Sequence, residues 1–231
     1  MLQTEASVTS VEKYPSFRYI APFAAFILFL AVSGRHVITP YWEAPLWVIV
    51  LAVLCFWAWP RELPLRTVRP WASIAVGALV FVLWIAPDLL IPGYRDLPAF
   101  SNSVTGKLHS SLRPAELQSV WILSWRTLRA AAIVPIVEEL FWRAWLMRWL
   151  IDPDFQKVRL GSYATVAFWV TAILFASEHG PYWDVGLITG IIYNLWMIRT
   201  RSVADCILTH AVTNALLSGY VIATSHWQYW Q

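Results

Sequence analysis

The sequence has few charged residues. Asp, Glu, Lys and Arg make up only 13% of its 231 residues, whereas 58% are hydrophobic. A soluble domain contains about 25% charged and about 45–50% apolar residues, and the mean hydropathy of this chain is +0.55. These values exclude an ordinary soluble domain and indicate an integral membrane protein. The 16 Trp residues fit this interpretation, because Trp is enriched where a membrane meets water.

Cysteine is scarce, and basic residues do not cluster. The two cysteines, Cys55 and Cys206, each lie inside an apolar run. Neither a C-x-x-C pair nor a Cys/His metal spacing occurs, so neither a disulfide framework nor a Cys-rich zinc site is supported. The net charge is only +3. Without a concentrated Lys/Arg patch, we expect no nucleic-acid partner.

Long apolar runs dominate the chain. A membrane-spanning helix needs about 20 mostly apolar residues. Seven stretches are candidates, the last one in spite of its charges: 19–34, 44–60, 70–87, 160–177, 185–198, the run after Asp205, and 119–149. The runs are continuous and do not alternate, which favours helices over a β-barrel. The sequence therefore predicts an all-α, polytopic transmembrane helix bundle of about seven spans, with residues 1–231 forming a single integral membrane domain.

The segment 88–118 interrupts this pattern with Pro, Gly and charged residues, and it is expected to lie outside the membrane or at its surface. Near its end, the sequence "RPAELQ" predicts a helix start with Pro114 in the first turn. Three loops rich in basic residues, 61–70, 148–159 and 199–201, fall on one side of a seven-span bundle. The positive-inside rule makes that side cytoplasmic, together with the N-terminus.

Three charges occur together in "VEELFWRAWL", inside the stretch 119–149. Ionisable residues within membrane helices face the bundle interior or a polar cavity and are functional candidates. Glu139 and Arg143 are four residues apart and so lie on one helix face, where they can pair. Glu138 has no such partner and would be left for chemistry. The alternative is that all three residues form a packing network between helices.

Two further polar sites lie on other predicted helices. His179 ends an apolar run in "FASEHG", whereas His210 and Asn214 share one helix face in "HAVTNALL". Each site alone could be structural. Together with Glu138 they suggest a water-activating site in an intramembrane polar cavity, with a carboxylate as general base and His or Asn near a developing oxyanion. Glu138, His179 and His210 could instead hold a divalent metal such as zinc.

The three sites resemble the motifs of the CAAX-protease and bacteriocin-processing (CPBP) family. "EELFWR" fits E-E-x-x-x-R, "FASEH" fits F-x-x-x-H, and "HAVTN" fits H-x-x-x-N, in the family's order. The resemblance covers residues 120–222. It implies an intramembrane endopeptidase, a hydrolase in which Glu138 activates water, His179 assists, and His210 with Asn214 stabilises the oxyanion or completes a metal site. It also implies supporting roles for Glu139, Arg143 and Phe175.

The end of the chain also resembles a bacterial subgroup, the CAAX prenyl protease-related proteins associated with exosortase sorting systems. That resemblance implies an inner-membrane protein with a functional link to such a system. Its substrate would be a lipidated or sorted protein, or a peptide, whose C-terminus is associated with the membrane. Membrane lipid would be a further partner. Two other interpretations remain open, namely a catalytically silent binding, immunity or scaffold protein and a transporter or proton relay.

The predicted spans place the candidate residues at different depths. Glu138 lies in mid-helix, His210 lies near the cytoplasmic end of its run, and His179 lies at the opposite end of its own run. With a rise of 1.5 Å per residue, these positions differ by about 10 Å. The three residues can act together only if the helix before His179 is short or tilted, if the cavity is deep, or if the span count differs.

Overall fold

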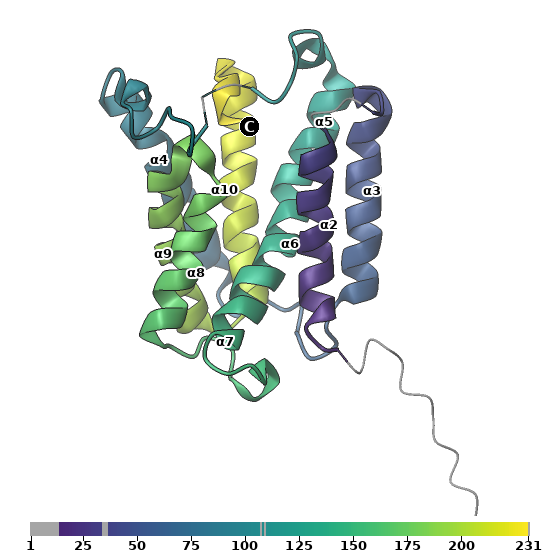
Figure 1. The fold of residues 1–231 in the computed structure, drawn as a ribbon, viewed down its shortest axis with the longest axis vertical. Helices are drawn as coiled ribbons and strands as arrows, with labels where there is room; N and C mark the ends of the chain where they lie inside the picture. The colour runs from purple at the N-terminus through teal and green to yellow at the C-terminus, as the bar shows by residue number, and fades with distance from the viewer. Residues whose placement is uncertain (1–13, 34–36, 107, 109, 231) are drawn as a thin grey trace, which may run out of the picture.

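The computed structural model describes residues 14–33, 37–106, 108 and 110–230, and within these ranges it contains helices and no named strand (Figure 1). Turns and loops join the helices, and the longest connection is the segment 91–119 between α4 and α5. The helices are α2 (Phe17–Ser33), α3 (Pro40–Ala58), α4 (Pro70–Leu90), α5 (Val120–Leu128), α6 (Val134–Glu139), α7 (Met147–Trp149), α8 (Thr165–Ser177), α9 (Trp183–Thr200) and α10 (Val203–Thr224).

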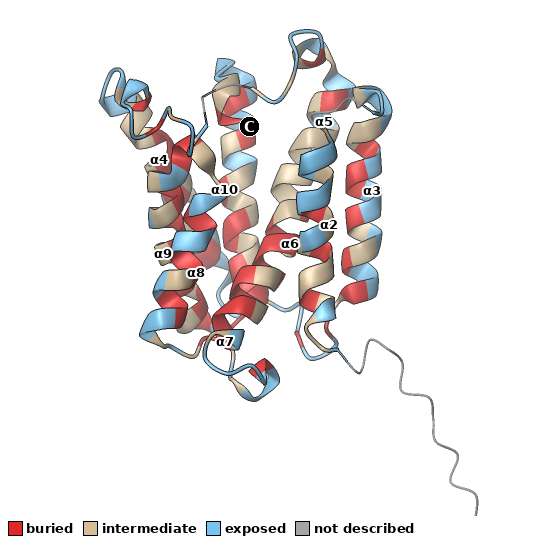
Figure 2. Ribbon diagram, viewed as in Figure 1, coloured by how far each residue is buried: buried red, intermediate tan, exposed pale blue. Residues whose placement is uncertain are grey.

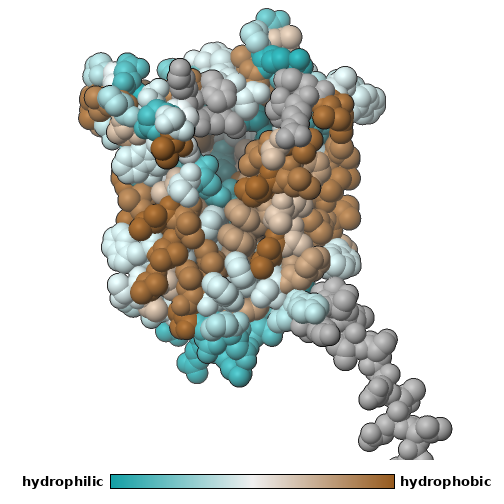
Figure 3. Space-filling view, viewed as in Figure 1, coloured by the Kyte–Doolittle hydropathy of each residue, from teal (hydrophilic) through white to brown (hydrophobic). Residues whose placement is uncertain are grey.

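Four helical stretches are long and apolar enough to cross a membrane: Pro40–Ala58, Pro70–Leu90, Val120–Trp149 and Val203–Thr224. The apolar helices Phe17–Ser33 and Thr165–Ser177 are shorter. Large apolar side chains such as Phe56 and Trp71 point outward, 89% and 83% exposed, and hydrophobic residues form a band between two more hydrophilic ends (Figure 3). The predicted all-α membrane bundle is confirmed.

The helix that carries "EELFWR" runs through the middle of the bundle. α5, α6 and α7 are joined by two π-helical segments, Arg129–Ile133 and Leu140–Leu146, so that 120–149 is one continuous helix, as expected. α2 and α3 pack together on one side of it, whereas α8 packs along α9 and α4 along α10 on the other. Many buried residues lie in this central helix and in the parts of the other helices around it (Figure 2).

The predicted helix start at Pro114 is wrong. Residues Glu116–Gln118 form a separate 3₁₀ turn, in which the Glu116 carboxylate accepts a hydrogen bond from the Arg113 backbone N–H. The backbone at Ser119 is extended, with φ −92° and ψ 104°, so this turn cannot continue into α5. The Ser119 hydroxyl instead accepts a hydrogen bond from the Ile122 N–H and caps the helix that begins at Val120.

α8 is shorter than its apolar run. The run begins at residue 160, but the helix begins at Thr165 and ends at Ser177 after 13 residues. With 13 residues, α8 is about 20 Å long. It is much shorter than α10, which has 22 residues. His179 consequently lies inside the bundle and not at its far surface. This short helix removes the depth conflict that the sequence raised.

Glycines permit the close helix crossings beside the central helix. A Cβ at Gly186 would lie 3.3 Å from the Ala176 Cα and from the His179 Cβ, and one at Gly190 would lie 3.1 Å from the Ala172 carbonyl oxygen. Gly186 and Gly190 therefore allow α9 to pack closely against α8. This contact fixes the position of the chain that leads into His179.

Candidate active site

Glu139 and Arg143 form the expected ion pair. The Arg143 Nη1 lies 2.9 Å from the Glu139 Oε1, and both side chains are fully buried. Arg143 Nε also donates a hydrogen bond to the Asn194 Oδ1 at 3.2 Å, and its guanidinium carbon lies 4.4 Å from the centre of the Phe175 ring. Since a buried ion pair persists only with such additional contacts, this pair holds α6 against α8 and α9.

His210 contacts Glu139 and not Glu138. Its Nδ1 lies 2.9 Å from the Glu139 Oε1, the same oxygen that pairs with Arg143. A carboxylate oxygen can only accept, so the hydrogen of this bond is on Nδ1. The Nε2 of His210 remains for other contacts. The sequence indicated neither this pairing nor the orientation it imposes on the imidazole ring.

The carbonyl of Phe175 orients His179. The distance from His179 Nδ1 to the Phe175 oxygen is 2.7 Å, and a carbonyl can only accept, so Nδ1 carries the hydrogen. In a neutral imidazole the lone pair is then on Nε2. The Phe175 ring is 1% exposed and packs 4.7 Å, centre to centre, from the His179 ring. Phe175 therefore has the packing position that its motif implies.

Asn214 joins the third motif to the central helix. Its Nδ2 donates a hydrogen bond to the Ala130 carbonyl oxygen at 2.8 Å. Ala130 lies in the π segment Arg129–Ile133, and π turns, which disturb the regular hydrogen-bond ladder of an α-helix, are frequent at functional sites. Asn214 thus holds α10 against the helix that carries Glu138 while one Nδ2 hydrogen remains unused by this bond.

One cavity brings all four predicted catalytic residues together. Its volume is about 180 Å³, and its walls include Glu138, His179, His210 and Asn214. Figure 3 shows a recess with hydrophilic side chains in the upper half of the molecule. Glu138 is 5% exposed, and within the described part of the chain no hydrogen-bond donor contacts its buried Oε2. A buried carboxylate in this situation calls for water or substrate as its partner.

Sequence reasoning missed several residues of this cavity. Arg126, Tyr193 and Trp230 line it, and the Tyr193 hydroxyl donates a hydrogen bond to the Thr213 Oγ1 at 2.8 Å. The charge of Arg126 inside an apolar stretch was a signal that could have been followed. Nothing in the sequence distinguishes Tyr193 or Trp230 from the many other aromatic residues.

A divalent metal held by Glu138, His179 and His210 is the alternative to a metal-free site. Among the described residues, no three His, Cys, Asp or Glu side chains are placed so that they could hold a metal ion. His179 and His210 each use Nδ1 in a hydrogen bond, an arrangement that leaves the Nε2 of each ring for a metal or for water. Zinc at this site stays a prediction, and the chemistry below is derived from the side chains alone.

A second network fixes the chain just after His179. The Arg95 guanidinium lies 2.7 Å from Asp88 and 2.5 Å from Asp184, and it donates a hydrogen bond to the Pro181 carbonyl oxygen. Burial alone would lower the pKa of Arg95, but the hydrogen bond and charge of Asp184 outweigh burial and raise it. Arg95 therefore stays charged and ties the turn after α4 to the segment 179–184.

Residues 119–216 match the family model described as type II CAAX prenyl endopeptidase Rce1-like. Over this range, the chain is similar to Rce1-like domains. The matched range contains all three motifs and every predicted site residue. No curated protein and no solved structure matches the chain. At the level of the family, the Rce1-like domain is that of a CAAX-type membrane protease, a hydrolase with a protein or peptide substrate at a membrane. The exosortase link stays a prediction.

Proposed function

We propose that this Rce1-like protein is an intramembrane endopeptidase that cuts near the C-terminus of a membrane-associated, lipidated or sorted protein. The observation that carries the proposal is the cavity in which Glu138, His179, His210 and Asn214 meet. Glu138 is the only one of the four without a hydrogen bond to the described part of the chain. It is therefore the group available to bind and deprotonate a water molecule.

In the proposed reaction, the Glu138 carboxylate takes a proton from water as the oxygen attacks the peptide carbonyl carbon. The lone pair on His179 Nε2 accepts the second hydrogen of that water and orients it. The oxyanion that forms receives a hydrogen bond from the remaining Nδ2 hydrogen of Asn214, with His210 beside it. When the C–N bond breaks, Glu138 returns its proton to the leaving amine. The products are a new amine and a new carboxylic acid, which keeps the second hydrogen of the water until it ionises in solvent.

The test is cleavage of a membrane-tailed peptide by the purified full-length protein in detergent. Glu138→Gln removes the base while it keeps the shape of the side chain, so we expect the rate to fall by about 10²–10⁴-fold. His179→Ala should cause a comparable loss. Asp154→Asn, at an exposed residue in the loop after α7, is the control and should cut like the wild type. If folded Glu138→Gln cuts equally well, the silent binding protein becomes the better interpretation.

A further inference from the structure

An open groove of about 810 Å³ runs along α9, where this helix packs beside α4. Its volume lies within the range of about 300–1,000 Å³ that is typical of ligand sites. Among the described residues, it shares no lining side chain with the catalytic cavity. Its lining consists of six hydrophobic side chains from the two helices and two arginines: Val76, Leu79, Ile192, Leu195, Trp196, Ile198, Arg199 and Arg201.

The hydrophobic part of the groove is open to the surroundings of the bundle. Leu79 and Leu195 are 53% and 52% exposed, and α4, which carries Leu79, is long and apolar enough to cross a membrane. Ile192, Leu195 and Arg199 are spaced by three and four residues, so they lie on one face of α9. Together they cover about 10 Å along the helix. The groove therefore has the form of a hydrophobic channel that ends at a positive charge.

Trp196 gives this groove a fixed wall. Its Nε1 donates a hydrogen bond to the Ser73 Oγ at 3.2 Å, and the Ser73 hydroxyl donates one to the Asp205 Oδ1 at 2.9 Å. Asp205 also accepts hydrogen bonds from the backbone N–H groups of Val68 and Arg69. These bonds join α9 to the starts of α4 and α10, so the indole ring is held in place before a ligand binds.

An unusual turn places Arg201 at the groove. α9 ends at Thr200, and Arg201 follows with φ 53°, a left-handed conformation in which Gly or Asn is more common. Its backbone N–H donates a hydrogen bond to the Met197 carbonyl oxygen at 2.8 Å. A Cβ at Gly161 would lie 3.0 Å from the Arg201 Cγ, so the loop before α8 packs closely on this side chain. The turn thereby brings Arg201 and Arg199 to the same groove.

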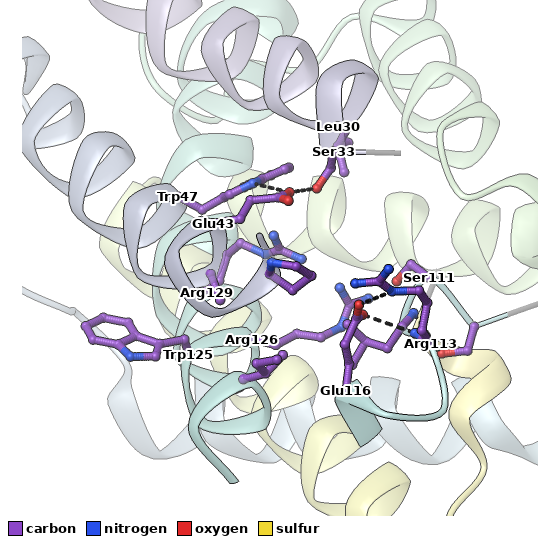
Figure 4. A pocket seen from close by; sticks show the side chains of 15 residues that line it. Leu30, Ser33, Glu43, Trp47, Ser111, Arg113, Glu116, Trp125, Arg126 and Arg129 are labelled. Atoms are coloured by element: carbon purple, nitrogen blue, oxygen red, sulfur yellow. Dashed lines mark hydrogen bonds and ion pairs between the residues drawn. The ribbon is translucent and has the colours of Figure 1, made fainter. Parts of the chain in front are cut away.

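The two positive charges have no carboxylate beside them in the groove lining. In the described ranges, the side chains of Arg199 and Arg201 make no hydrogen bond or ion pair. The cavity among α2, α3 and α5 differs (Figure 4), because Glu43 and Glu116 lie beside its arginines and Glu116 pairs with Arg113. Unpaired basic residues between membrane helices at the basic end of a bundle are suited to anionic lipid headgroups.

We propose that the groove between α4 and α9 binds one anionic phospholipid from the leaflet at the basic end of the bundle. Arg199 and Arg201 bind its phosphate, because a guanidinium group matches two phosphate oxygens at once. One acyl chain lies along α9 against Trp196. The two arginines favour a headgroup with a net negative charge over a zwitterionic one, whose ammonium group they repel. A soluble phosphate would leave the hydrophobic channel uncovered.

Native mass spectrometry of the full-length protein in detergent tests this site, with phosphatidylglycerol and phosphatidylcholine of identical acyl chains as probes. We expect the wild type to bind phosphatidylglycerol about tenfold more tightly, which is about 1.4 kcal/mol. Arg199→Gln combined with Arg201→Gln should abolish this preference, whereas Arg199→Lys combined with Arg201→Lys should keep most of it. Arg61→Gln combined with Arg66→Gln is the matched control, because it removes two exposed arginines of the same end that lie outside the groove.

The hydrophobic part of the groove has its own test. Leu79→Trp fills the channel while both arginines remain, and it should weaken phosphatidylglycerol binding by about fivefold, because contact with one or two methylene groups of the acyl chain is lost. Leu89→Trp is the control and should bind like the wild type, since Leu89 is a 56% exposed residue of α4 that lies outside the groove. Thermal unfolding in detergent verifies that each variant is folded.

Equal binding of the two lipids by the wild type would overturn the proposal. A loss of preference in the Arg61→Gln, Arg66→Gln control as large as in the groove variant would also overturn it. If soluble glycerol phosphate displaces phosphatidylglycerol and Leu79→Trp changes nothing, the arginines bind a free phosphate and the lipid assignment is wrong. A wild-type dimer that Leu79→Trp separates, without any preference between the lipids, would make the groove an interface between two copies and contradict the proposal.

Discussion

Glu138 and Glu139 are neighbours in the sequence with different surroundings. One carboxylate oxygen of Glu139 accepts hydrogen bonds from both Arg143 and His210, and the side chain is fully buried. Glu138 lines the catalytic cavity. Successive residues of a helix are rotated by about 100°, so Glu138 and Glu139 point in different directions. Glu139 holds neighbouring helices together, and Glu138 is available to bind water.

This division predicts that the same substitution has a large effect on stability at Glu139 and a small one at Glu138. Glu139→Gln removes the negative charge from a buried Arg143 and should lower the free energy of unfolding by about 3–5 kcal/mol. Glu138→Gln should change it by far less, because no ion pair is lost. Thermal unfolding of both variants in detergent measures the difference. Equal stability of the two variants would show that Glu139 is not the structural partner.

Part of this residue-level detail could be predicted from the sequence. The spacing of Glu139 and Arg143 predicted their pairing, because contacts four residues apart are local to one helix. The contact of His210 with Glu139 could not be predicted, since it joins residues 71 positions apart and depends on how two helices cross. Trp230, which lines the same cavity, could not be predicted either, because it comes from a distant part of the chain.

Among the helices, the crossing of α4 and α10 positions His210. Gly77 lies at this crossing, and its carbonyl oxygen accepts a hydrogen bond from the Thr213 hydroxyl at 2.9 Å. A Cβ at Gly77 would collide with the Thr209 carbonyl oxygen and lie 2.9 Å from the Val212 Cβ. Hydropathy predicted both helices, but the closeness of their contact comes from tertiary packing, as do the π segments and the late start of α8.

Gly77→Ala should therefore force α4 away from α10. Because the obstacle is backbone, which cannot rotate aside, we expect a loss of about 1–3 kcal/mol in stability, typical of an overpacked core, together with reduced cleavage. Gly219→Ala is the matched control, since no atom lies within 4 Å of the Cβ it would add. Melting temperatures in detergent test the pair. A Gly77→Ala protein as stable as the control would contradict this view of the crossing.

For the whole molecule, the basic residues gather at one end of the bundle. That end is formed by the start of α2, the α3–α4 loop, α7 with the loop after it, and the α9–α10 turn (Figure 1). Its basic residues are Arg18, Arg61, Arg66, Arg69, Arg148, Lys157, Arg159, Arg199 and Arg201. In the described ranges of the opposite end, Arg95 and Arg113 are both paired with carboxylates. The catalytic cavity is lined by Tyr229 and Trp230, which belong to this opposite end. By the positive-inside rule, we expect the cavity to open away from the cytoplasm.

Cysteine labelling tests this orientation. Val104→Cys introduces a thiol at a site that is 92% exposed at the cavity end, whereas Asp154→Cys introduces one at the basic end. In intact cells, a maleimide that cannot cross membranes should label Val104→Cys only, and Asp154→Cys should react after permeabilisation. The reverse pattern would mean that the cavity opens to the cytoplasm. The two native cysteines are buried and should stay unlabelled.

The most direct measurement is cleavage of a membrane-tailed peptide in ¹⁸O-labelled water, with the products analysed by mass spectrometry. If Glu138 activates water, the wild type forms a single new C-terminus that carries one ¹⁸O, and folded Glu138→Gln forms this product at least about 10²-fold more slowly. A labelled product formed at the wild-type rate by Glu138→Gln, or a wild-type product without ¹⁸O, would contradict the account.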